Sequence, residues 1–417
     1  MPHYHIWTIG CQMNKAESER LGNLFEQHGY QATASLDEAD IIVLNSCVVR
    51  QSAENRATSR LQSLKPLKKA NPGLILALTG CLVNSDNALL KKNFPHVDYF
   101  FKPGDHPQWL EQASWAQTLP LQVPASEYVP IIQGCDNFCS YCIVPYRRGR
   151  EISRPLAEIR DEVKELVLRG AKEITLLGQN VDSYGHDLPG RPDLADLLSE
   201  LNDIPGLSRL RFLTNHPKDM TTRLIAAVAT LDKVCEQINL PVQSGDNDIL
   251  ELMKRGYTAE HYRRLITQTR RQLPEGAIST DVIVGFPSES EEQFGQTFNL
   301  LCELMFDTVH VAAYSPRPGT VAARELDDNV PTAEKSRRLN AIEHLQEKIA
   351  AEINARLLGG TVEILVEGRK KGKWQGRTRS GKIVFFTDNG NHLGQLVDVR
   401  IEKTGPWSMQ GKIALNK

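Results

Sequence analysis

Three closely spaced cysteines are the strongest chemical feature of the sequence. The run Cys135-Asp-Asn-Phe-Cys139-Ser-Tyr-Cys142 follows Gly134 and has the spacing C-x3-C-x2-C. Three thiolates on one short loop can ligate three irons of a [4Fe–4S] cube and leave the fourth iron open to a substrate or cofactor. Structural zinc needs four ligands, and the sequence near this loop offers no fourth Cys or His. The spacing therefore predicts a redox-active iron–sulfur cluster.

A second set of three cysteines is dispersed in the sequence. Cys11, Cys47 and Cys81 each lie just beyond a short apolar run that predicts a parallel strand. The carboxyl ends of parallel strands meet at one crevice, where ligands bind. The pattern leaves two interpretations open, metal ligands or small buried residues. Cys235 and Cys302 lie within apolar patterns and have no partner, so we expect both in the core.

Basic residues gather in two stretches. Residues 369–382 hold seven Lys and Arg, no acid and one Trp, which suits phosphate contact and base stacking, although charge runs are often solvated loops. A second basic stretch follows the cysteine loop directly, where it could guide an anionic substrate. The candidate RNA-binding residues are Arg147, Arg148, Arg150, Arg154, Lys371, Arg377 and Arg379.

The first hundred residues must position the dispersed cysteines. The apolar runs 5–9, 41–44 and 74–78 each precede a stretch with helical spacing, such as 16–28. This alternation predicts a small parallel α/β domain over residues 1–115. Scattered prolines, Pro103, Pro107, Pro120 and Pro124, predict a passage to a second domain.

The alternation of strands and helices resumes at Tyr128. Six strands are predicted at 128–133, 173–177, 209–214, 237–240, 278–284 and 309–314. Helical stretches separate them, for example 156–169, which Gly170 ends. We expect an α/β fold with a partial (β/α)6 barrel over residues 121–352. After a helix near 333–358, apolar runs at 361–366, 382–387 and 396–401 predict a small β-barrel over residues 355–417.

Composition supports a folded, multidomain protein. The chain has 417 residues, of which 41% are hydrophobic and 24% charged, and this length favours two or three domains. The net charge of −2 hides an asymmetry, because the last 58 residues carry +6. No apolar run approaches the ~18 residues of a membrane span, and no secretory signal is evident. We expect a cytoplasmic protein without membrane association, whose cysteines serve metal binding rather than disulfides.

The surroundings of the cysteines resemble a known family. The spacing of Cys135, Cys139 and Cys142 is similar to the signature of the radical S-adenosylmethionine (SAM) superfamily. The run Cys142-Ile-Val-Pro-Tyr-Arg-Arg-Gly-Arg-Glu-Ile-Ser-Arg154 resembles the methylthiotransferase family, most closely its tRNA-modifying MiaB branch. Matching segments occur around each N-terminal cysteine, at 177–185, 240–245, 279–287 and 314–320, and in the tail, which is similar to a TRAM domain, an RNA-binding β-barrel.

The resemblance assigns roles to particular residues. It implies a second, auxiliary [4Fe–4S] cluster on Cys11, Cys47 and Cys81. It also implies SAM at the open iron, held by polar groups at the barrel rim, for which the candidates are Tyr141, Gln179, Asn180, Gln243 and Asp281. Two residues depart from the family pattern, Asp182 where Asn is usual and Asn215 where Ser is common. These departures bear on fine specificity, since neither is a cluster ligand.

The resemblance also implies a reaction that uses SAM twice. In one use, a sulfur at the auxiliary cluster takes the methyl group. In the other, an electron from the barrel cluster cleaves SAM to a 5′-deoxyadenosyl radical, which activates C2 of N6-dimethylallyladenosine next to the tRNA anticodon. The implied partners are tRNA, a reducing electron donor such as flavodoxin or ferredoxin, and an iron–sulfur carrier. We expect a monomer.

Three alternatives remain open from the sequence. Sister branches with the same clusters methylthiolate threonylcarbamoyladenosine in tRNA or an aspartate of a ribosomal protein, although the run 145–154 favours the dimethylallyl branch. From another class, the chain could be an RNA-binding iron–sulfur sensor without catalysis. A sensor would not need an open iron beside a SAM-lined rim.

Overall fold

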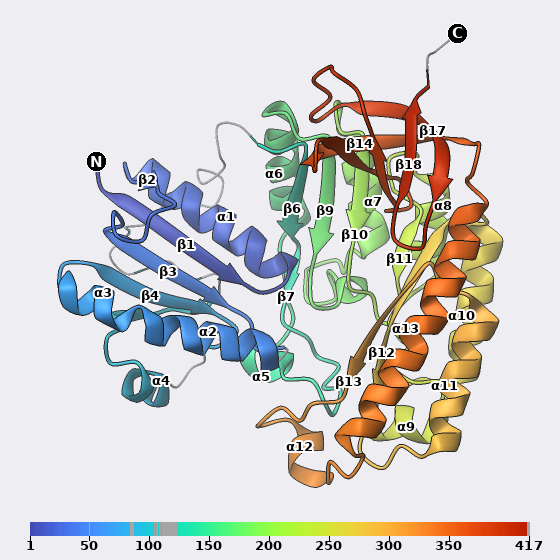
Figure 1. Cartoon of the computed structure of the whole chain (residues 1–417), viewed down its shortest axis with the longest axis horizontal. Coiled ribbons are helices and arrows are strands. Elements are labelled where there is room, and N and C mark those ends of the chain that lie inside the picture. Colours follow the sequence, from blue (N-terminus) through green and yellow to red (C-terminus); the bar gives the residue numbers. More distant parts are fainter. Residues whose placement is uncertain are drawn as a thin grey trace.

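The chain forms three successive structural units in the computed structural model, which describes residues 1–49, 51–83, 87–103, 105, 107, 110 and 123–414 (Figure 1). The first unit, in blue, lies beside a green, yellow and orange barrel, and the red C-terminal unit lies against one end of that barrel. The predicted boundary between residues 115 and 121, with Pro120, lies outside the described residues.

The N-terminal unit is a parallel sheet with strand order β2-β1-β3-β4-β5. Every residue of the central strand β3 is buried, as expected for a parallel strand covered on both faces. The elements are β1 (His3–Ile9), α1 (Gln12–Gln27), β2 (Gln31–Ala32), β3 (Ile41–Ser46), α2 (Gln51–Ser63), α3 (Lys65–Ala70), β4 (Ile75–Gly80), α4 (Ala88–Asn93) and β5 (Tyr99–Phe100). The three predicted strands are confirmed, and α1 begins four residues earlier than expected.

The middle unit contains the six expected parallel barrel strands, arranged as sheets β6-β9-β10 and β11-β12-β13. A bridge between Leu210 and Val234 links the two sheets. The strands are β6 (Ser126–Pro130), β9 (Glu173–Leu177), β10 (Arg209–Phe212), β11 (Gln237–Asn239), β12 (Ala277–Val284) and β13 (Thr308–Ala313). The prediction of a partial barrel is confirmed.

The first predicted barrel strand is divided in two. β7 (Ile132–Gln133) leaves the barrel and pairs antiparallel with β8 (Ile152–Ser153), so that residues 134–151 form an excursion closed at its base. This excursion carries the three closely spaced cysteines and α5 (Val144–Arg148). The divided strand therefore presents the cysteine loop beyond the barrel rim.

Helices cover the outside of the barrel (Figure 1). Several begin with the side-chain caps that stabilise a first turn, such as Asp193 and Ser290. With α5, the helices of the middle unit are α6 (Leu156–Leu168), the short 3-10 helix η2 (Val181–Ser183), α7 (Leu194–Asn202), α8 (Thr222–Thr230), α9 (Asn247–Leu252), α10 (Ala259–Gln272), α11 (Glu291–Leu304), α12 (Val321–Glu325) and α13 (Thr332–Ala355). Within the described part of the chain, no helix is both long and apolar enough to span a membrane.

The C-terminal unit is a closed barrel of five strands with order β14-β15-β16-β18-β17. Its strands are β14 (Thr361–Lys370), β15 (Lys373–Thr378), β16 (Ile383–Phe386), β17 (Leu396–Thr404) and β18 (Met409–Ile413). The sequence predicted three of these strands. It missed β15 and β18, because β15 is made of the basic residues that indicated a loop and β18 (Met-Gln-Gly-Lys-Ile) contains a glycine and no apolar run. Much of the basic stretch is thus a hairpin.

Buried charge joins the C-terminal barrel to the middle unit. Arg209 on β10 is 1% exposed and donates from Nη2 to Glu363 Oε1 at 2.9 Å and from Nη1 to the carbonyl of Arg377 at 2.7 Å. Arg211 donates to the carbonyls of Thr378 and Arg379 at 2.8 and 2.6 Å. Two arginines on one barrel strand therefore fix the position of the β14–β15 hairpin.

Candidate iron–sulfur sites and substrate cavity

The cysteine loop of the barrel begins at a glycine that no other residue could replace easily. Gly134 has φ +83, and a Cβ there would collide with the carbonyl of Arg150. Its N–H donates to Gln179 Oε1 at 2.6 Å, and the N–H of Cys135 donates to the carbonyl of Gly149 at 3.2 Å. The loop is therefore held at both ends, directly above the end of β9.

The thiols of this loop are partly or fully enclosed. Burial raises the pKa of Cys142 to about 12 and that of Cys135 to about 11. Such thiols stay protonated at neutral pH unless a metal replaces the proton. Arg255 approaches the third thiol, with Nη1 3.3 Å from Cys139 Sγ. The sequence analysis missed Arg255, because it lies 116 residues from Cys139 and only the fold brings the two together.

The three N-terminal cysteines follow β1, β3 and β4 as predicted. A hydrogen bond from the Cys81 thiol lowers the pKa of Cys47 to about 7, and the same bond raises the pKa of Cys81. Cys11 also interacts electrostatically with Cys47. Cys47 and Cys81 thus contact each other, and the exposed Cys11 follows β1, the neighbour of β3 in the sheet.

Two buried asparagines position the loops of this second trio. Asn14 Nδ2 donates to Asn45 Oδ1 at 2.7 Å and to the carbonyl of Ser46 at 3.0 Å, while Asn45 Nδ2 donates to the carbonyl of Asn14 at 2.9 Å. Asn14 Oδ1 in turn lies 3.3 Å from Cys11 Sγ. These amides connect the Cys11 turn to the Cys47 loop, a role that the sequence analysis did not assign.

The donor sets fit iron–sulfur clusters better than single metal ions. Among the described residues, no three His, Cys, Asp or Glu side chains converge closely enough to bind one metal ion. A [4Fe–4S] cube does not require such convergence, because each iron takes a separate thiolate. Two groups of three cysteines, one group after strands of the N-terminal unit and one on the loop after β7, match that requirement.

Cys81 lies at the interface between the N-terminal unit and the segment that follows the cysteine loop. Arg148, the last residue of α5, places Nε 3.2 Å from Cys81 Sγ. α5 begins two residues after Cys142 and lies where the N-terminal unit meets the barrel (Figure 1). The packing of Met13 and Ala16 of α1 against Leu177 of β9 closes the same interface.

Most of the residues predicted for SAM lie beyond the ends of barrel strands or in the cysteine loop. Gln179 and Asn180 follow β9, Gln243 follows β11 and forms a bridge with Val282, and Asp281 lies within β12. Tyr141 lies between the cysteines and accepts a hydrogen bond from Arg255 Nη1 at 3.3 Å. The rim also contains buried atoms without a partner among the described residues, Asn180 Oδ1, Asn215 Oδ1 and His216 Nε2. Such atoms fit a polar ligand that would complete their hydrogen bonds.

Some of the strained backbone positions lie near the same rim. Four non-glycine residues with positive φ lie in the cysteine loop or just beyond β10, β11 and β12: Phe138, Thr214, Gln243 and Ser288. Each such conformation costs of order 1 kcal/mol or more, and strain of this kind gathers at functional sites. Its position supports the rim as a ligand site.

The two departures from the family pattern contact each other. Asn215 Nδ2 donates to Asp182 Oδ1, and the backbone N–H of His216 donates to Asp182 Oδ2 at 2.8 Å. Burial raises the pKa of Asp182 to about 7. The two unusual residues therefore form one coupled pair beneath the rim.

The predicted RNA-binding residues beyond the cysteine loop divide into two kinds. Arg148 and Arg154 are engaged within the protein, Arg148 with Glu17 and Arg154 with Glu158 and Glu162. The side chain of Arg150 is 70% exposed, and the partly buried Arg147 has an Nε without a partner among the described residues. RNA contact by these residues stays a prediction, which the geometry favours for Arg147 and Arg150.

The predicted residues of the tail divide in the same way. Arg379 Nη2 donates to Glu236 Oε1 at 2.7 Å and to the carbonyl of Val234 at 2.7 Å, so it contacts the middle unit. Lys371 lies in the exposed turn between β14 and β15, and Arg377 is half exposed on β15. Of the three predicted residues of the tail, Lys371 and Arg377 are thus the accessible ones.

A cavity of about 780 Å³ lies where the three units meet. Gln12 of the N-terminal unit, adjacent to Cys11, lines one side. The barrel contributes Tyr128 and Arg211, and the C-terminal unit contributes Arg377. Its volume is within the range of ~300–1,000 Å³ that is usual for small-molecule sites. One cavity therefore extends from the C-terminal barrel to Gln12, the residue after Cys11.

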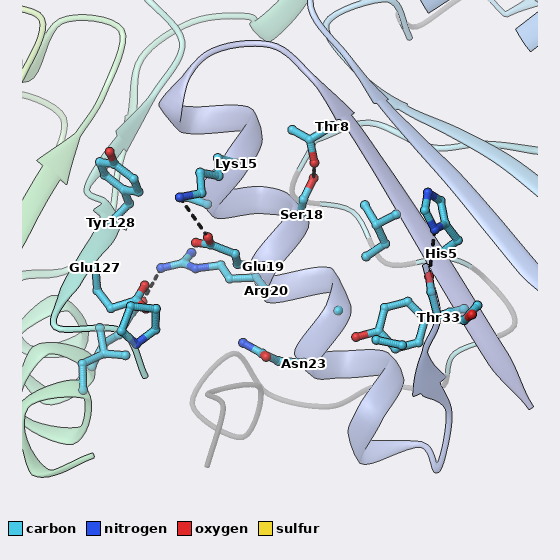
Figure 2. Close-up of a pocket in the computed structure, with 18 residues that line it drawn as sticks. His5, Thr8, Lys15, Ser18, Glu19, Arg20, Asn23, Thr33, Glu127 and Tyr128 are labelled. Carbon is cyan, nitrogen blue, oxygen red and sulfur yellow. Dashed lines mark hydrogen bonds and ion pairs between the residues drawn. The ribbon is translucent and has the colours of Figure 1, made fainter. Parts of the chain in front are cut away.

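A second cavity, of about 520 Å³, lies between α1 and β6 (Figure 2). Figure 2 shows Lys15, Glu19 and Arg20 of α1 facing Glu127 and Tyr128 of the barrel. None of the six clustered cysteines is among the described residues that line it. Arg20 pairs with Glu162 there, so this cavity belongs to the contact between the two units.

The two isolated cysteines differ from each other. Cys235 is buried, as expected. The prediction that Cys302 is a core residue is wrong, since Cys302 is exposed. On α11 the buried face consists of Phe294, Thr297, Leu300, Leu301 and Leu304, and position 302 points away from it.

Comparisons with known families match three successive segments of the chain. Residues 3–102 match a family described as Uncharacterized protein family UPF0004, residues 129–301 the Radical SAM superfamily, and residues 355–414 the TRAM domain. The radical SAM methyltransferase TsrM from Kitasatospora setae is a structural neighbour, with TM-score 0.52, 14% identity, and coverage of 78% of this chain and 75% of that chain. The cobalamin-dependent SAM radical enzyme OxsB has TM-score 0.51 and 10% identity, covering 83% and 56%. These similarities concern the fold.

The fold and the three-cysteine loop define a radical SAM enzyme, a class that uses SAM and a [4Fe–4S] cluster. Over 413 residues the chain is 56% identical to the tRNA-2-methylthio-N(6)-dimethylallyladenosine synthase of Dehalococcoides mccartyi (strain CBDB1), covering 99% of both chains. A synthase of the same name from Roseiflexus sp. (strain RS-1) is 51% identical, covering 99% of this chain and 89% of that protein. The chain belongs to the family of tRNA-2-methylthio-N(6)-dimethylallyladenosine synthases.

Proposed function

We propose that the protein transfers a methylthio group to C2 of N6-dimethylallyladenosine next to the anticodon of tRNA, using two molecules of SAM and two [4Fe–4S] clusters. The names of its relatives support the substrate. The observation that carries the proposal is the contact of Arg148 with Cys81, which brings the N-terminal trio against the helix that follows Cys142. A radical site and a sulfur site can then act on one substrate atom.

The cysteines are assigned to the two clusters. Cys135, Cys139 and Cys142 would hold the cluster that binds SAM, and Cys11, Cys47 and Cys81 the auxiliary cluster. When bound, these groups supply the radical and the sulfur. The protein supplies position and exclusion of water. The unpartnered rim atoms Asn180 Oδ1 and His216 Nε2 would bind polar groups of SAM, together with Tyr141, Gln179, Gln243 and Asp281.

The RNA approaches from the C-terminal barrel in this proposal. Lys371 and Arg377 neutralise phosphates, and Arg377 also lines the three-unit cavity that reaches Gln12 beside Cys11. Arg147 and Arg150 supply positive charge on the other side of the cysteine loop. The same proposal places the reaction in the cytoplasm and includes a monomer, a reducing donor such as flavodoxin or ferredoxin, and an iron–sulfur carrier.

Mass spectrometry of tRNA nucleosides tests the substrate. Cells that lack the gene should lose 2-methylthio-N6-dimethylallyladenosine and accumulate N6-dimethylallyladenosine, and the intact gene should restore the product. Loss of the methylthio form of threonylcarbamoyladenosine instead would favour the sister tRNA branch. Loss of the modified ribosomal aspartate would favour the ribosomal branch, and persistence of the product in the deletion, with no second enzyme present, would overturn the proposal.

Three cysteine variants test the division of labour. Cys139→Ala should abolish reductive cleavage of SAM, whereas Cys47→Ala should retain SAM cleavage and stop sulfur insertion. Cys302→Ala is the matched control, because Cys302 is exposed and belongs to neither trio. Product formed by Cys47→Ala would show that the auxiliary site is wrongly assigned. Failure of the reconstituted wild-type protein to cleave SAM would favour the sensor.

A further inference from the structure

Arg148 makes an unusual set of contacts for an arginine beside a cysteine. Its side chain is 3% exposed. Nη1 donates to Glu17 Oε1 at 2.6 Å and Nη2 to Glu17 Oε2 at 3.4 Å, so the carboxylate holds the guanidinium in a fork. Nε is directed at Cys81 Sγ, 3.2 Å away. The barrel thus contributes a fixed cation to the N-terminal cysteine site.

The two residues that Arg148 contacts come from separate segments of the N-terminal unit. Arg148 lies six residues beyond Cys142, whereas Glu17 lies on α1, which begins directly after Cys11. One guanidinium therefore connects the segment of one trio to two segments of the other. A buried charge of this kind is stable only with such partners.

A second arginine of the middle unit, Arg317, contacts the segment that follows Cys47. Arg317 follows β13 and is 6% exposed. Its Nη2 donates to the carbonyl of Val49 and its Nη1 to Gln51 Oε1, both at 2.9 Å. Two separate arginines of the middle unit therefore contact the cysteine loops that follow β3 and β4.

We propose that Arg148 is a positioning residue for the auxiliary cluster, which it supports by a charged hydrogen bond to Cys81 while its ion pair with Glu17 locks the N-terminal unit onto the barrel. The inference rests on the proposed function, because it assumes a cluster on Cys11, Cys47 and Cys81. Hydrogen bonds to the sulfurs of a cluster raise its reduction potential, and outer partners of this kind typically contribute about 10–100-fold to metal affinity.

The test isolates the auxiliary cluster in the full chain. Cys135, Cys139 and Cys142 are changed to Ala together, and the protein is reconstituted with iron and sulfide without oxygen. Arg148→Gln and Arg148→Lys are then added in separate proteins. Arg150→Gln is the matched control, because it removes an equal charge from the same segment while its side chain is 70% exposed and pairs with Asp136.

Two readouts independent of enzyme activity decide the inference. Arg148→Gln should release iron to a chelator about tenfold faster or more and should lower the reduction potential measured by EPR titration. Arg148→Lys keeps the charge and can pair with Glu17, so it should restore most of the potential but not the slow release of iron. Arg150→Gln should match the parent protein in both measurements.

The outcomes separate the inference from the proposed function. If the parent protein binds no iron, the auxiliary site itself is wrong and the inference fails with it. If the parent binds iron and both Arg148 variants match it, Arg148 has no positioning role and the cluster assignment stands. Should Arg148→Gln fail to fold, iron release from Arg148→Lys decides between these results.

Discussion

At the scale of single residues, Asp182 is a buried carboxyl without a cationic partner. It is 6% exposed, and its oxygens accept only from Asn215 Nδ2 and the N–H of His216 among the described residues. Burial raises its pKa from 3.8 in the unfolded chain to about 7. The folded protein therefore holds a proton that the unfolded chain has lost over roughly pH 4 to 7. Stability from this group is present at low pH and is lost as the pH rises through 7.

Asp182→Asn should remove this dependence. The amide can still accept from His216, and Asn215 can rotate so that its unpartnered Oδ1 accepts from the new amide. We expect the variant to be more stable than wild type at pH 8 by about 1–2 kcal/mol, and the difference to shrink towards pH 5. Urea unfolding of the barrel at both pH values measures it. Asp203→Asn, at an exposed site, is the control, and an equal difference at both pH values would contradict the assignment.

Charged residues also orient both cysteine sites. Arg255 contacts Cys139, and Arg148 contacts Cys81, each from a distant part of the sequence. The positions of Cys135, Cys139 and Cys142 follow from their local spacing. Local spacing does not identify the arginines that contact the cysteines, because those contacts depend on which loops the barrel brings together.

At the scale of elements, the turn between β15 and β16 is joined to the middle unit by a small group of ion pairs. Arg379 pairs with Glu236, and Lys382 Nζ donates to Asp307 Oδ1 at 2.6 Å. These residues belong to the basic stretch that the sequence assigned to RNA. Part of that positive charge therefore serves docking, since carboxylates of the barrel lie within reach.

Arg379→Gln should weaken the contact of the turn after β15 with the middle unit, without unfolding the C-terminal barrel. The pair is about one-third exposed, with side-chain exposures of 30% and 36%, so we expect a cost of only about 1 kcal/mol. Hydrogen exchange should become faster at the end of β15 and unchanged in β17. Lys412→Gln, whose side chain is 75% exposed, provides the control. Equal exchange in both variants would contradict the docking role.

At the scale of the whole molecule, accessible positive charge lies on the C-terminal barrel and beside the cysteine loop, with the three-unit cavity reaching Arg377. Phosphate contacts make RNA affinity depend steeply on salt. Lys371→Ala should weaken tRNA binding, and the slope of log affinity against log salt should become shallower by about 1 for a lost phosphate contact. Filter binding across a salt series measures this slope.

A matched surface variant separates local from overall charge in that experiment. Lys69 is exposed on α3 of the N-terminal unit, on the opposite side of the molecule from the C-terminal barrel (Figure 1), and Lys69→Ala removes the same charge. It should leave the slope unchanged. An equal loss in both variants would mean that overall charge, rather than a contact at Lys371, governs binding.

The sequence by itself determined the loop of Cys135, Cys139 and Cys142, the order of the three units and most strands, because local spacing and apolar periodicity encode them. The grouping of Cys11, Cys47 and Cys81 came from the family resemblance, since their dispersed spacing left two interpretations open. Only the tertiary structure decided which polar residues serve the sites. In the sequence, the basic residues Arg148 and Arg379 cannot be told apart from their neighbours Arg150 and Lys371. In the structure, Arg148 and Arg379 are engaged within the protein, whereas Arg150 and Lys371 are accessible. Whether a charge is buried depends on the opposing carboxylates, Glu17 and Glu236, that distant segments bring beside it.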